Sequence, residues 1–392
     1  MLEWVFAVNV FLVLYTYLGY GLVLFLLNKL YPAKSLTSVV DYPAVTLLVA
    51  AYNEEDWIEQ KIENCLALDY PRDKLRLLLV TDGSTDLTTQ KAKSFLVPKD
   101  FSIQIMFNPK RLGKLAAVDR VMPWVETPIV VFSDANTTLN PQAIQNLVKY
   151  YADPKVGAVA GEKRIHIADK DEASSAGEGL YWKYESLLKR WDAQLGSVVG
   201  AAGELFSIRT QLYERIPADT LIEDFYLTLT VLRKGYRIAY AEDAYAIENS
   251  SASVGEELKR KIRISAGGLQ ASWRLRDLLN PWRYGVFSWQ FFSHKVMRWT
   301  LAPLALPFVF LSNTALAWTG SIFYVLLFIL QLVFYLLALL GWVFERKKIK
   351  VKILFIPYYF CMMNYAVFLG LLRLIKGEQT VLWEKVERKG TQ

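Results

Sequence analysis

Three long stretches without charged residues constrain this chain more than any other feature of its sequence. Residues 4–28, 299–344 and 353–372 contain no Asp, Glu, Lys or Arg. A helix rises about 1.5 Å per residue, so about 20 such residues cross the roughly 30 Å hydrocarbon layer of a membrane. We therefore expect one membrane helix near the N-terminus and three near the C-terminus, the first two of which form a hairpin that turns near residues 312–319.

The charges around these stretches predict the orientation. Five of the residues 346–352 are Arg or Lys, and basic loops between membrane helices lie preferentially in the cytoplasm. Following the chain back through the hairpin places residues 41–280 in the cytoplasm too. Either residues 353–372 do not cross completely or the basic tail ends outside, and the sequence leaves both open. We expect a multi-pass protein of the cell membrane with a cytoplasmic polar domain.

The chain divides into five segments. Between residues 281 and 298, aromatic side chains mingle with Arg283, Lys295 and Arg298, which is typical of a helix in the membrane interface. An aromatic helix packed on the domain surface is the alternative. The predicted segments are an N-terminal membrane helix with its linker (1–40), a cytoplasmic α/β domain (41–280), an interfacial amphipathic helix (281–298), C-terminal membrane helices (299–376) and a tail (377–392).

The composition excludes several classes of protein. Lys and Arg exceed Asp and Glu by only 45 − 38 = +7, and the polar region has no basic block of the density that nucleic-acid binding requires. We expect no nucleic-acid partner. The two cysteines, Cys65 and Cys361, lie far apart, and there are only two histidines. Neither a disulfide framework nor a Cys/His metal centre can be built from them.

Short apolar runs in the polar region alternate with helical patterns. Residues 45–51, 75–81, 103–107 and 128–133 have the pattern of buried strands. This repetition predicts a largely parallel sheet with helices on both faces. Helix caps and turns would explain the polar residues after each strand singly, but their repetition favours a binding site. These polar residues are Asn53, Asp82 and Asp134.

A nucleotide diphosphate would find suitable partners at these strand ends. Asp82 can accept a hydrogen bond from a uracil ring nitrogen. Asp134 and Asn136 offer two oxygens to Mg²⁺ or Mn²⁺. Lys114 follows Gly113 just before a predicted helix, where it can bind phosphate. The sequence therefore predicts a metal-assisted nucleotide site.

Two further clusters suit group transfer. Glu223 and Asp224 begin a helical pattern, so one carboxylate can take a proton from an attacking hydroxyl while the other orients it. Matching the helix dipole is the alternative role. Arg260 and Arg263 lie on a later basic helix and can stabilise a departing diphosphate, although a solvated charge run would need no function. We expect residues 162–179 to be ordinary surface rather than an acceptor-binding loop.

The order of these motifs resembles glycosyltransferase family 2, in its membrane-integrated branch with the cellulose, hyaluronan, chitin-oligosaccharide and poly-N-acetylglucosamine synthases. The resemblance covers nearly the whole chain. Each motif is weak alone, but six in this order between membrane segments are specific. The motifs are Ala51-Tyr52-Asn53-Glu54, Val80-Thr81-Asp82-Gly83-Ser84-Thr85-Asp86, Gly113-Lys114, Ser133-Asp134-Ala135-Asn136, Gly200-Ala201-Ala202-Gly203-Glu204 and Glu223-Asp224.

The resemblance implies a GT-A, Rossmann-like fold for the cytoplasmic domain and an inverting transfer from a UDP-sugar. Asp224, beside Glu223, would be the general base, and Mg²⁺ or Mn²⁺ would be held by Asp134 and Asn136. Gly203 and Glu204 would lie near the acceptor. The implied nucleotide-binding residues are Ala51, Tyr52, Asn53, Glu54, Asp82, Lys114, Asp134, Arg260 and Arg263.

One motif departs from the family pattern. Where processive members carry Gln-x-x-Arg-Trp, this chain has Arg260, Arg263 and Ile264. The tryptophan that would stack on the acceptor is therefore missing, and another aromatic residue would have to replace it. The candidates are Tyr181, Trp182 and Trp273.

Two functions remain open at this point. The favoured hypothesis is a synthase that extends a β-linked polysaccharide or oligosaccharide. The alternative, which Ile264 favours, is a non-processive transferase that adds one sugar to a lipid or lipid-linked acceptor. A transporter subunit is disfavoured because the apolar stretches contain few polar residues. The expected partners are a UDP-sugar, a carbohydrate or lipid-linked acceptor and the bilayer, while a second copy or an export protein is left open.

Overall fold

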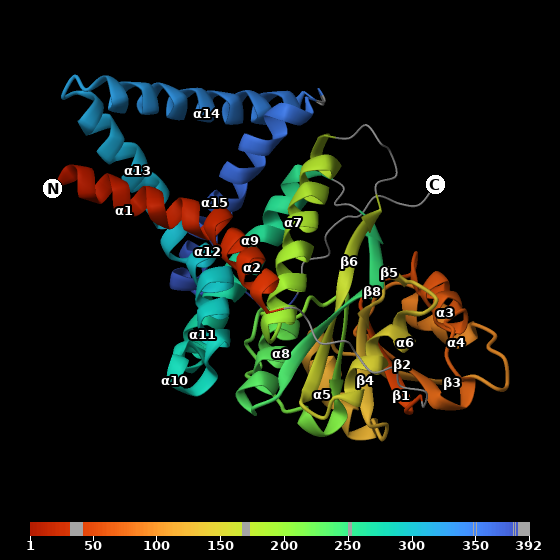
Figure 1. The fold of residues 1–392 in the computed structure, drawn as a ribbon. Helices are drawn as coiled ribbons and strands as arrows, with labels where there is room; N and C mark the ends of the chain where they lie inside the picture. The colour runs from red at the N-terminus through yellow and green to blue at the C-terminus, as the bar shows by residue number, and fades with distance from the viewer. Residues whose placement is uncertain are drawn as a thin grey trace.

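The computed structural model describes residues 1–31, 42–166, 173–249, 253–347, 349, 351–378, 380 and 382. Figure 1 shows an α/β domain on one side and a group of apolar helices on the other, with the N-terminus at the far end of the apolar helices. Helices α7 (Ala173–Leu195) and α9 (Val254–Arg274) lie between the two parts. They contact the apolar helices α2 (Tyr20–Leu30) and α15 (Lys352–Lys376).

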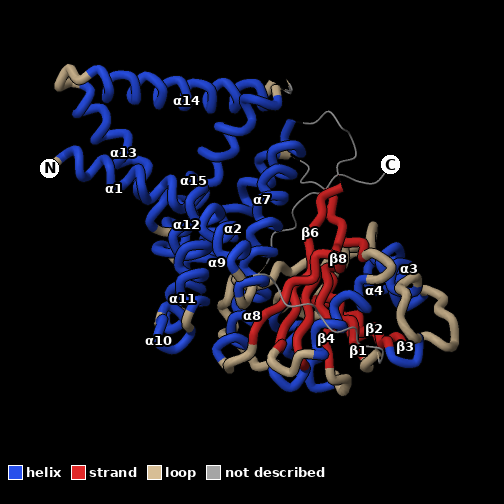
Figure 2. Tube along the Cα trace, viewed as in Figure 1, coloured by secondary structure: helices blue, strands red, loops and turns tan. Residues whose placement is uncertain are grey.

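The domain is built on one mixed sheet, which Figure 2 shows as a single layer of strands. The strand order is β3-β2-β1-β4-β7-β6-β8-β5. Strands β3, β2, β1 and β4 pair in parallel, whereas β7 runs antiparallel to both β4 and β6. The strands are β1 (Val45–Ala51), β2 (Leu75–Asp82), β3 (Ser102–Asn108), β4 (Ile129–Asp134), β5 (Thr137–Leu139), β6 (Val156–His166), β7 (Leu205–Arg209) and β8 (Arg237–Asn249).

The four predicted strands are confirmed. Strands β1, β2 and β4 are near-continuous apolar runs because helices cover both faces, whereas β3, at the edge of the sheet, is only partly buried. In β1, Leu48 joins one core cluster while Leu47 and Val49 join the cluster on the opposite face. The prediction of a largely parallel sheet is confirmed, because β6 and β8 also pair in parallel, and among the described strands it is β7 and β5 that run against the others. Strands β6 and β8 were not predicted, because their buried charged residues hide the apolar pattern of a strand.

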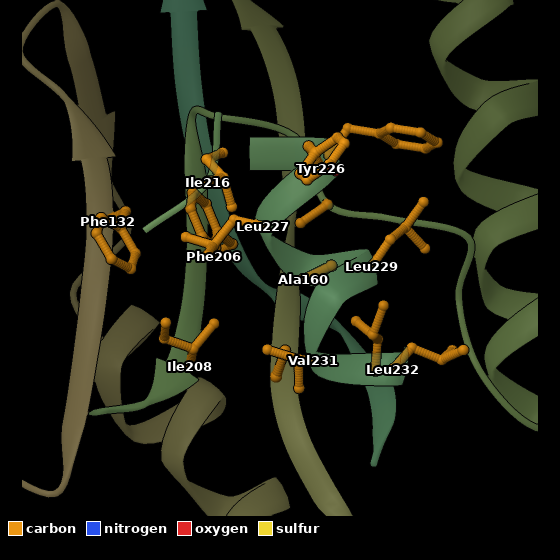
Figure 3. Close-up of a cluster of buried hydrophobic side chains, with 14 of the residues drawn as sticks. Phe132, Ala160, Phe206, Ile208, Ile216, Tyr226, Leu227, Leu229, Val231 and Leu232 are labelled. Atoms are coloured by element: carbon orange, nitrogen blue, oxygen red, sulfur yellow. The ribbon is translucent and has the colours of Figure 1, made fainter. Parts of the chain in front are cut away.

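Helix α8 fixes the edge of the sheet where the polar residues gather. Figure 3 shows Leu227, Leu229 and Val231 of this helix among side chains of the sheet, and these residues belong to the same buried cluster as Phe206 and Ala160. The predicted helix at this place is confirmed. The domain helices are α3 (Ile58–Leu66), α4 (Thr88–Ser94), α5 (Lys114–Val121), α6 (Ala143–Val148), α7 (Ala173–Leu195), α8 (Glu223–Arg233) and α9 (Val254–Arg274).

Within the described residues, three helices are long and apolar enough to span a membrane, and a fourth span results if a pair bent by 54° counts as one. The chain is therefore a membrane protein with three to four candidate membrane helices. The hairpin turn follows Ala317, slightly later than predicted. The spans are Leu2–Leu30 (α1, η1 and α2), α14 (Ile322–Arg346), Ile353–Lys376 within α15 (Lys352–Lys376), and the bent pair Val286–Trp299 with α13 (Leu301–Ala317).

The segment predicted as one interfacial helix is a series of short pieces. Gly285, with a φ of 56°, interrupts the helix after the first piece. Phe291 and His294 are buried, whereas Trp282 is 96% exposed. A location at the membrane interface stays a prediction, as do the segment boundaries. The pieces are α10 (Pro281–Tyr284), α11 (Val286–Phe291), η7 (Phe292–Val296) and α12 (Met297–Trp299).

Candidate active site

The carboxyl ends of β1, β2 and β4 bring the predicted nucleotide-binding residues to one edge of the sheet. In the strand register, Ala51 pairs with Thr81 of β2 and Ala50 pairs with Asp134 of β4. Asp82 and Asp134 therefore flank the end of β1, before the loop with Asn53. In proteins with open α/β sheets, ligands bind at this edge, beyond the carboxyl ends of the parallel strands.

Asn53 and Glu54 tie the loops after β1 and β2 together. Asn53 has a left-handed backbone with φ 55°, and its Oδ1 accepts a hydrogen bond from the Thr85 N–H at 2.9 Å. The Glu54 N–H donates to Thr88 Oγ1 at 2.7 Å. The ring of Tyr52 lies 3.8 Å from the Arg111 guanidinium. This stacked pair at the nucleotide edge includes Arg111, which the sequence analysis did not select.

Asp82 holds the loop that leads into α5. Its Oδ2 accepts hydrogen bonds from the backbone N–H groups of Leu112 at 2.9 Å and Gly113 at 2.6 Å. Gly113 has a φ of 96°, which favours glycine. Asp82 therefore fixes the backbone just before Lys114. Its contact with a uracil ring stays a prediction.

Lys114 lies at the centre of the charged groups of the site. Its Nζ is 2.6 Å from Asp134 Oδ1 and 3.2 Å from Glu223 Oε1. Burial disfavours the charged lysine, but the two carboxylates outweigh this effect and hold the pKa of Lys114 above its usual value. Burial also raises the pKa of Asp134, which Lys114 partly offsets. The structure thus joins three predicted residues from three separate elements.

Asp224 has the properties of a general base. Burial and the neighbouring carboxylate of Glu223 raise the pKa of Asp224 to about 7. A Cβ on Gly203 would lie only 3.2 Å from Asp224 Oδ2, so the glycine keeps space open beside the carboxylate. A carboxylate whose pKa is near the working pH is well suited to accept a proton in catalysis.

Asp134 and Asn136 fit a divalent cation bound together with a diphosphate. Asn136 follows β4 in the turn to β5. The ammonium of Lys114 already lies on Asp134, so this carboxylate attracts positive charge. In the described parts of the chain, no group of three or more His, Cys, Asp or Glu residues forms a closed metal site. Mg²⁺ and Mn²⁺ suit such an open site because phosphate and water oxygens complete their coordination.

The two predicted arginines face different charges. Arg263 is buried, which lowers its pKa, and its strongest attractions are to Glu223, Asp224 and Asp134. Arg263 therefore lies toward these carboxylates, and its contact with a nucleotide stays a prediction. Arg260 instead lies 2.9 Å from Glu257 and 3.7 Å from Glu248.

Lys163 is a buried residue of the site that the sequence analysis missed. Its ammonium contacts both Glu204 and Glu248. Burial opposes the charge of Glu204, but Lys163 outweighs it and lowers the pKa of that carboxyl. Glu162 and Lys163 are buried in β6, so the expectation of ordinary surface is wrong for them; residues 167–172 lie outside the described chain. The sequence contained no signal that these two charged residues of β6 are buried.

The candidates for the missing tryptophan lie in different surroundings. Trp273 is 71% exposed. Tyr181 and Trp182 of α7 lie beside Lys261, 4.4 Å and 5.5 Å from its ammonium. A further aromatic, Trp299, was missed by the sequence analysis. Its ring packs on the face of α9 at Gly268, where any Cβ would overlap it.

Comparison with known sequences supports this interpretation. Residues 46–216 match the pattern of Glycosyl transferase family 2. The chain is 28% identical over 250 residues to Poly-beta-1,6-N-acetyl-D-glucosamine synthase of Staphylococcus aureus (strain MSSA476), which covers 62% of this chain and 58% of that protein. It is 28% identical over 211 residues to Probable glycosyltransferase YdaM of Bacillus subtilis (strain 168), with 51% of this chain and 49% of that protein covered. The chain thus spans between about half and three fifths of the length of these curated relatives.

A solved structure is similar over almost the full length. The mannosyltransferase PcManGT from Pyrobaculum calidifontis, in complex with GDP-Man and Mn²⁺, has a TM-score of 0.73 and 22% sequence identity, and the match covers 96% of this chain and 100% of that chain. This similarity confirms the predicted GT-A-like α/β domain between N-terminal and C-terminal apolar helices.

Proposed function

We propose that the chain is a nucleotide-sugar-dependent glycosyltransferase of family 2 that transfers one sugar, with inversion, from a UDP-sugar to a hydroxyl of a lipid-linked acceptor. The reaction would take place at the cytoplasmic face of the membrane. The basic loop at residues 346–352 supports this orientation. The acidic and basic groups gathered around Lys114 support the chemistry.

In the proposed reaction, Asp224 accepts the proton of the acceptor hydroxyl, whose oxygen forms the new bond to the anomeric carbon. The bond from that carbon to the diphosphate breaks on the opposite face, which inverts the configuration. Lys114 and Arg263 stabilise the negative charge of the departing nucleotide diphosphate. Burial, together with the carboxylate of Glu223, keeps the pKa of Asp224 near 7, and Glu223 also holds Lys114 in position.

A divalent cation held by Asp134 and Asn136 would neutralise part of the diphosphate charge. The three carboxylates Asp134, Glu223 and Asp224 repel an anionic nucleotide, and this repulsion supports a requirement for such a cation. The similar mannosyltransferase was solved with Mn²⁺. Because its nucleotide is GDP-Man, GDP-mannose belongs among the donors to be tested beside the UDP-sugars.

The observation that supports transfer of a single sugar is that neighbouring segments pack tightly against the membrane-facing side of α9. Helix α15 approaches so tightly that a Cβ on Gly370 would lie 2.8 Å from the Ala266 N and 2.9 Å from the Ile262 O. Two residues after Ala266 on the same helix, the Trp299 ring covers Gly268. A growing polymer therefore has no room between α9 and these neighbours. Ile264 on the same helix likewise lacks the aromatic face of processive relatives.

Chain extension is the second candidate. It is favoured by the 28% identity over 250 residues to a poly-N-acetylglucosamine synthase. It would require α15 or Trp299 to move away from α9 so that the product can leave. The two candidates differ in their products, because a processive enzyme yields a ladder of lengths.

The proposal is tested with the full chain in nanodiscs made with total bacterial lipid extract. Each of UDP-glucose, UDP-N-acetylglucosamine, UDP-glucuronate, UDP-galactose and GDP-mannose is added with Mn²⁺ or Mg²⁺, and both nucleotide release and product masses are measured. We expect one UDP-sugar to yield lipids heavier by a single sugar, and EDTA to stop the reaction. A ladder of masses would replace this proposal with chain extension, and failure of every donor would refute both.

A further inference from the structure

Three buried lysines from three elements surround one indole ring behind the catalytic groups. The ring of Trp182 on α7 lies 5.1 Å from the ammonium of Lys163, 5.7 Å from that of Lys189 and 5.5 Å from that of Lys261. These lysines are 2%, 5% and 3% exposed. We call this group the lysine cluster.

Lys189 differs from the other two lysines because, among the described residues, its ammonium has no direct hydrogen-bond partner. Lys163 contacts Glu204 and Glu248, and Lys261 lies 3.5 Å from Glu257. Within the described residues, Lys189 Nζ is buried and has no hydrogen-bond partner. A buried ammonium without a counter-ion costs several kcal/mol, and a cation–π contact offsets only about 0.5–2 kcal/mol of that.

The indole of Trp182 points to the same missing group. Its N–H is buried and also has no acceptor in the described part of the chain. The nearby carboxylate of Glu162 accepts hydrogen bonds from the hydroxyls of Tyr240 and Ser186, and it makes no direct hydrogen-bond contact with the Trp182 N–H or the Lys189 ammonium among the described residues. An ammonium and an N–H donor that both lack an acceptor fit an anion with several oxygens, such as a phosphate group.

The lysine cluster lies between the catalytic groups and a membrane helix. On one side, Lys163 contacts Glu204, whose neighbour Gly203 lies against Asp224. On the other side, Tyr181 lies 6.2 Å from Tyr359 of α15. Tyr181 and Trp182 keep part of their surface exposed, whereas the Lys189 ammonium and the Trp182 N–H are buried.

We infer that the lysine cluster binds the phosphate group that joins the lipid to the sugar of the acceptor. The inference rests on the proposed function and deepens it. Lys189 connects to Asp224 through a series of contacts, from the Trp182 ring to Lys163, Glu204 and Gly203, so the phosphate in the proposed site is not the nucleophile. The acceptor is therefore a lipid-linked sugar with a phosphate or diphosphate linkage, whose sugar hydroxyl reaches Asp224 while its lipid lies along α15.

Binding to the full chain in nanodiscs tests this site without any sugar transfer. The probes are farnesyl phosphate, uncharged farnesol and inorganic phosphate, measured by calorimetry. We expect Lys189→Met to weaken farnesyl phosphate binding by about 10- to 100-fold, as expected for loss of a charged hydrogen bond. Trp182→Phe, which keeps the ring and removes the N–H, should weaken it less. Lys183→Met is the matched control, because Lys183 is exposed on the same helix, and it should bind like the unmodified chain.

Three results would overturn the inference. The first is equal binding of farnesyl phosphate to the Lys189→Met variant and to the unmodified chain. The second is binding of farnesol as tight as that of farnesyl phosphate. The third is binding of inorganic phosphate as tight as that of farnesyl phosphate, which would identify a site for free phosphate. If the Lys189→Met variant does not fold, binding of farnesyl phosphate to the Trp182→Phe variant tests the inference instead. Lys189-dependent binding with no sugar transfer from any donor would refute the proposed function alone. Equal transfer to acceptors with and without phosphate would refute this inference alone.

Discussion

The two ends of the candidate site differ in how their buried charges are paired. At the nucleotide end, Asp134, Glu223 and Asp224 face Lys114 and Arg263, so carboxylates are in excess. At the proposed acceptor end, Lys163 and Lys261 are paired with glutamates, whereas the Lys189 ammonium has no hydrogen-bond partner among the described residues. Since buried charges are costly unless they are paired, each end is prepared for a ligand of opposite charge. The nucleotide end suits a divalent cation, and the acceptor end suits a phosphate.

The largest effect is expected at the nucleotide end. Asp224→Asn removes the proton acceptor and should lower turnover by about 10²- to 10⁴-fold. Since Asn has nearly the same shape, binding of UDP with Mn²⁺ should stay close to that of the unmodified chain in calorimetry. Full turnover in this variant would remove Asp224 from the mechanism.

Replacing one buried lysine at each end of the site compares how much each lysine contributes to stability. Lys114→Met leaves Asp134 and Glu223 facing each other, which should lower the free energy of unfolding by about 3 kcal/mol. Lys189→Met removes an ammonium without a partner, so without ligand it should leave the free energy of unfolding unchanged or raise it. Thermal unfolding in detergent measures both. Equal destabilisation by the two variants would mean that Lys189 is neutralised within the fold.

The closed membrane side of α9 can be tested by adding one methyl group. Gly268→Ala places a Cβ against the Trp299 ring and should cost about 1–3 kcal/mol of stability because the contact is already tight. Gly255→Ala on the same helix is the control, since the nearest atom to its added Cβ, Ser253 Oγ, is 3.6 Å away. If both variants unfold at the same temperature, Trp299 does not pack on α9 as described.

The smallest effect concerns pH. Because Asp224 must be deprotonated to act as a base, the rate should rise with pH through its pKa of about 7. Burial, followed by the carboxylate of Glu223, raises this pKa, so Glu223→Gln should move the rising limb of the pH–rate curve to lower pH by about one unit. A limb that does not move would show that Glu223 does not act on the base.

The nucleotide end could be predicted from sequence because its residues follow regular strands. Asp82 and Asp134 come directly after apolar runs that form parallel strands, and such strands end at one edge. Glu223 and Asp224 begin α8, where paired acids before an apolar helix are easily recognised. Local pattern and topology together were enough there.

The acceptor end could not be predicted in the same way. Lys163 lies inside a strand, and Lys189 and Trp182 lie on a long helix of mixed polarity, where exposed lysines are the rule. Only the packing of α7 against the second half of the sheet buries them. Arg260 and Arg263 lie three residues apart on α9, yet they face different charges, which spacing alone did not show.

The most direct test of a single transfer to a phosphate-linked acceptor counts the sugars on each acceptor molecule. The full chain in nanodiscs is given a synthetic farnesyl-diphosphate-linked hexose and a large excess of the active nucleotide sugar, and product masses are followed over time by mass spectrometry. We predict that every converted acceptor gains one sugar and that the Asp224→Asn variant converts almost none. A series of products with increasing numbers of sugars, or equal conversion of the same hexose without its lipid diphosphate, would contradict this.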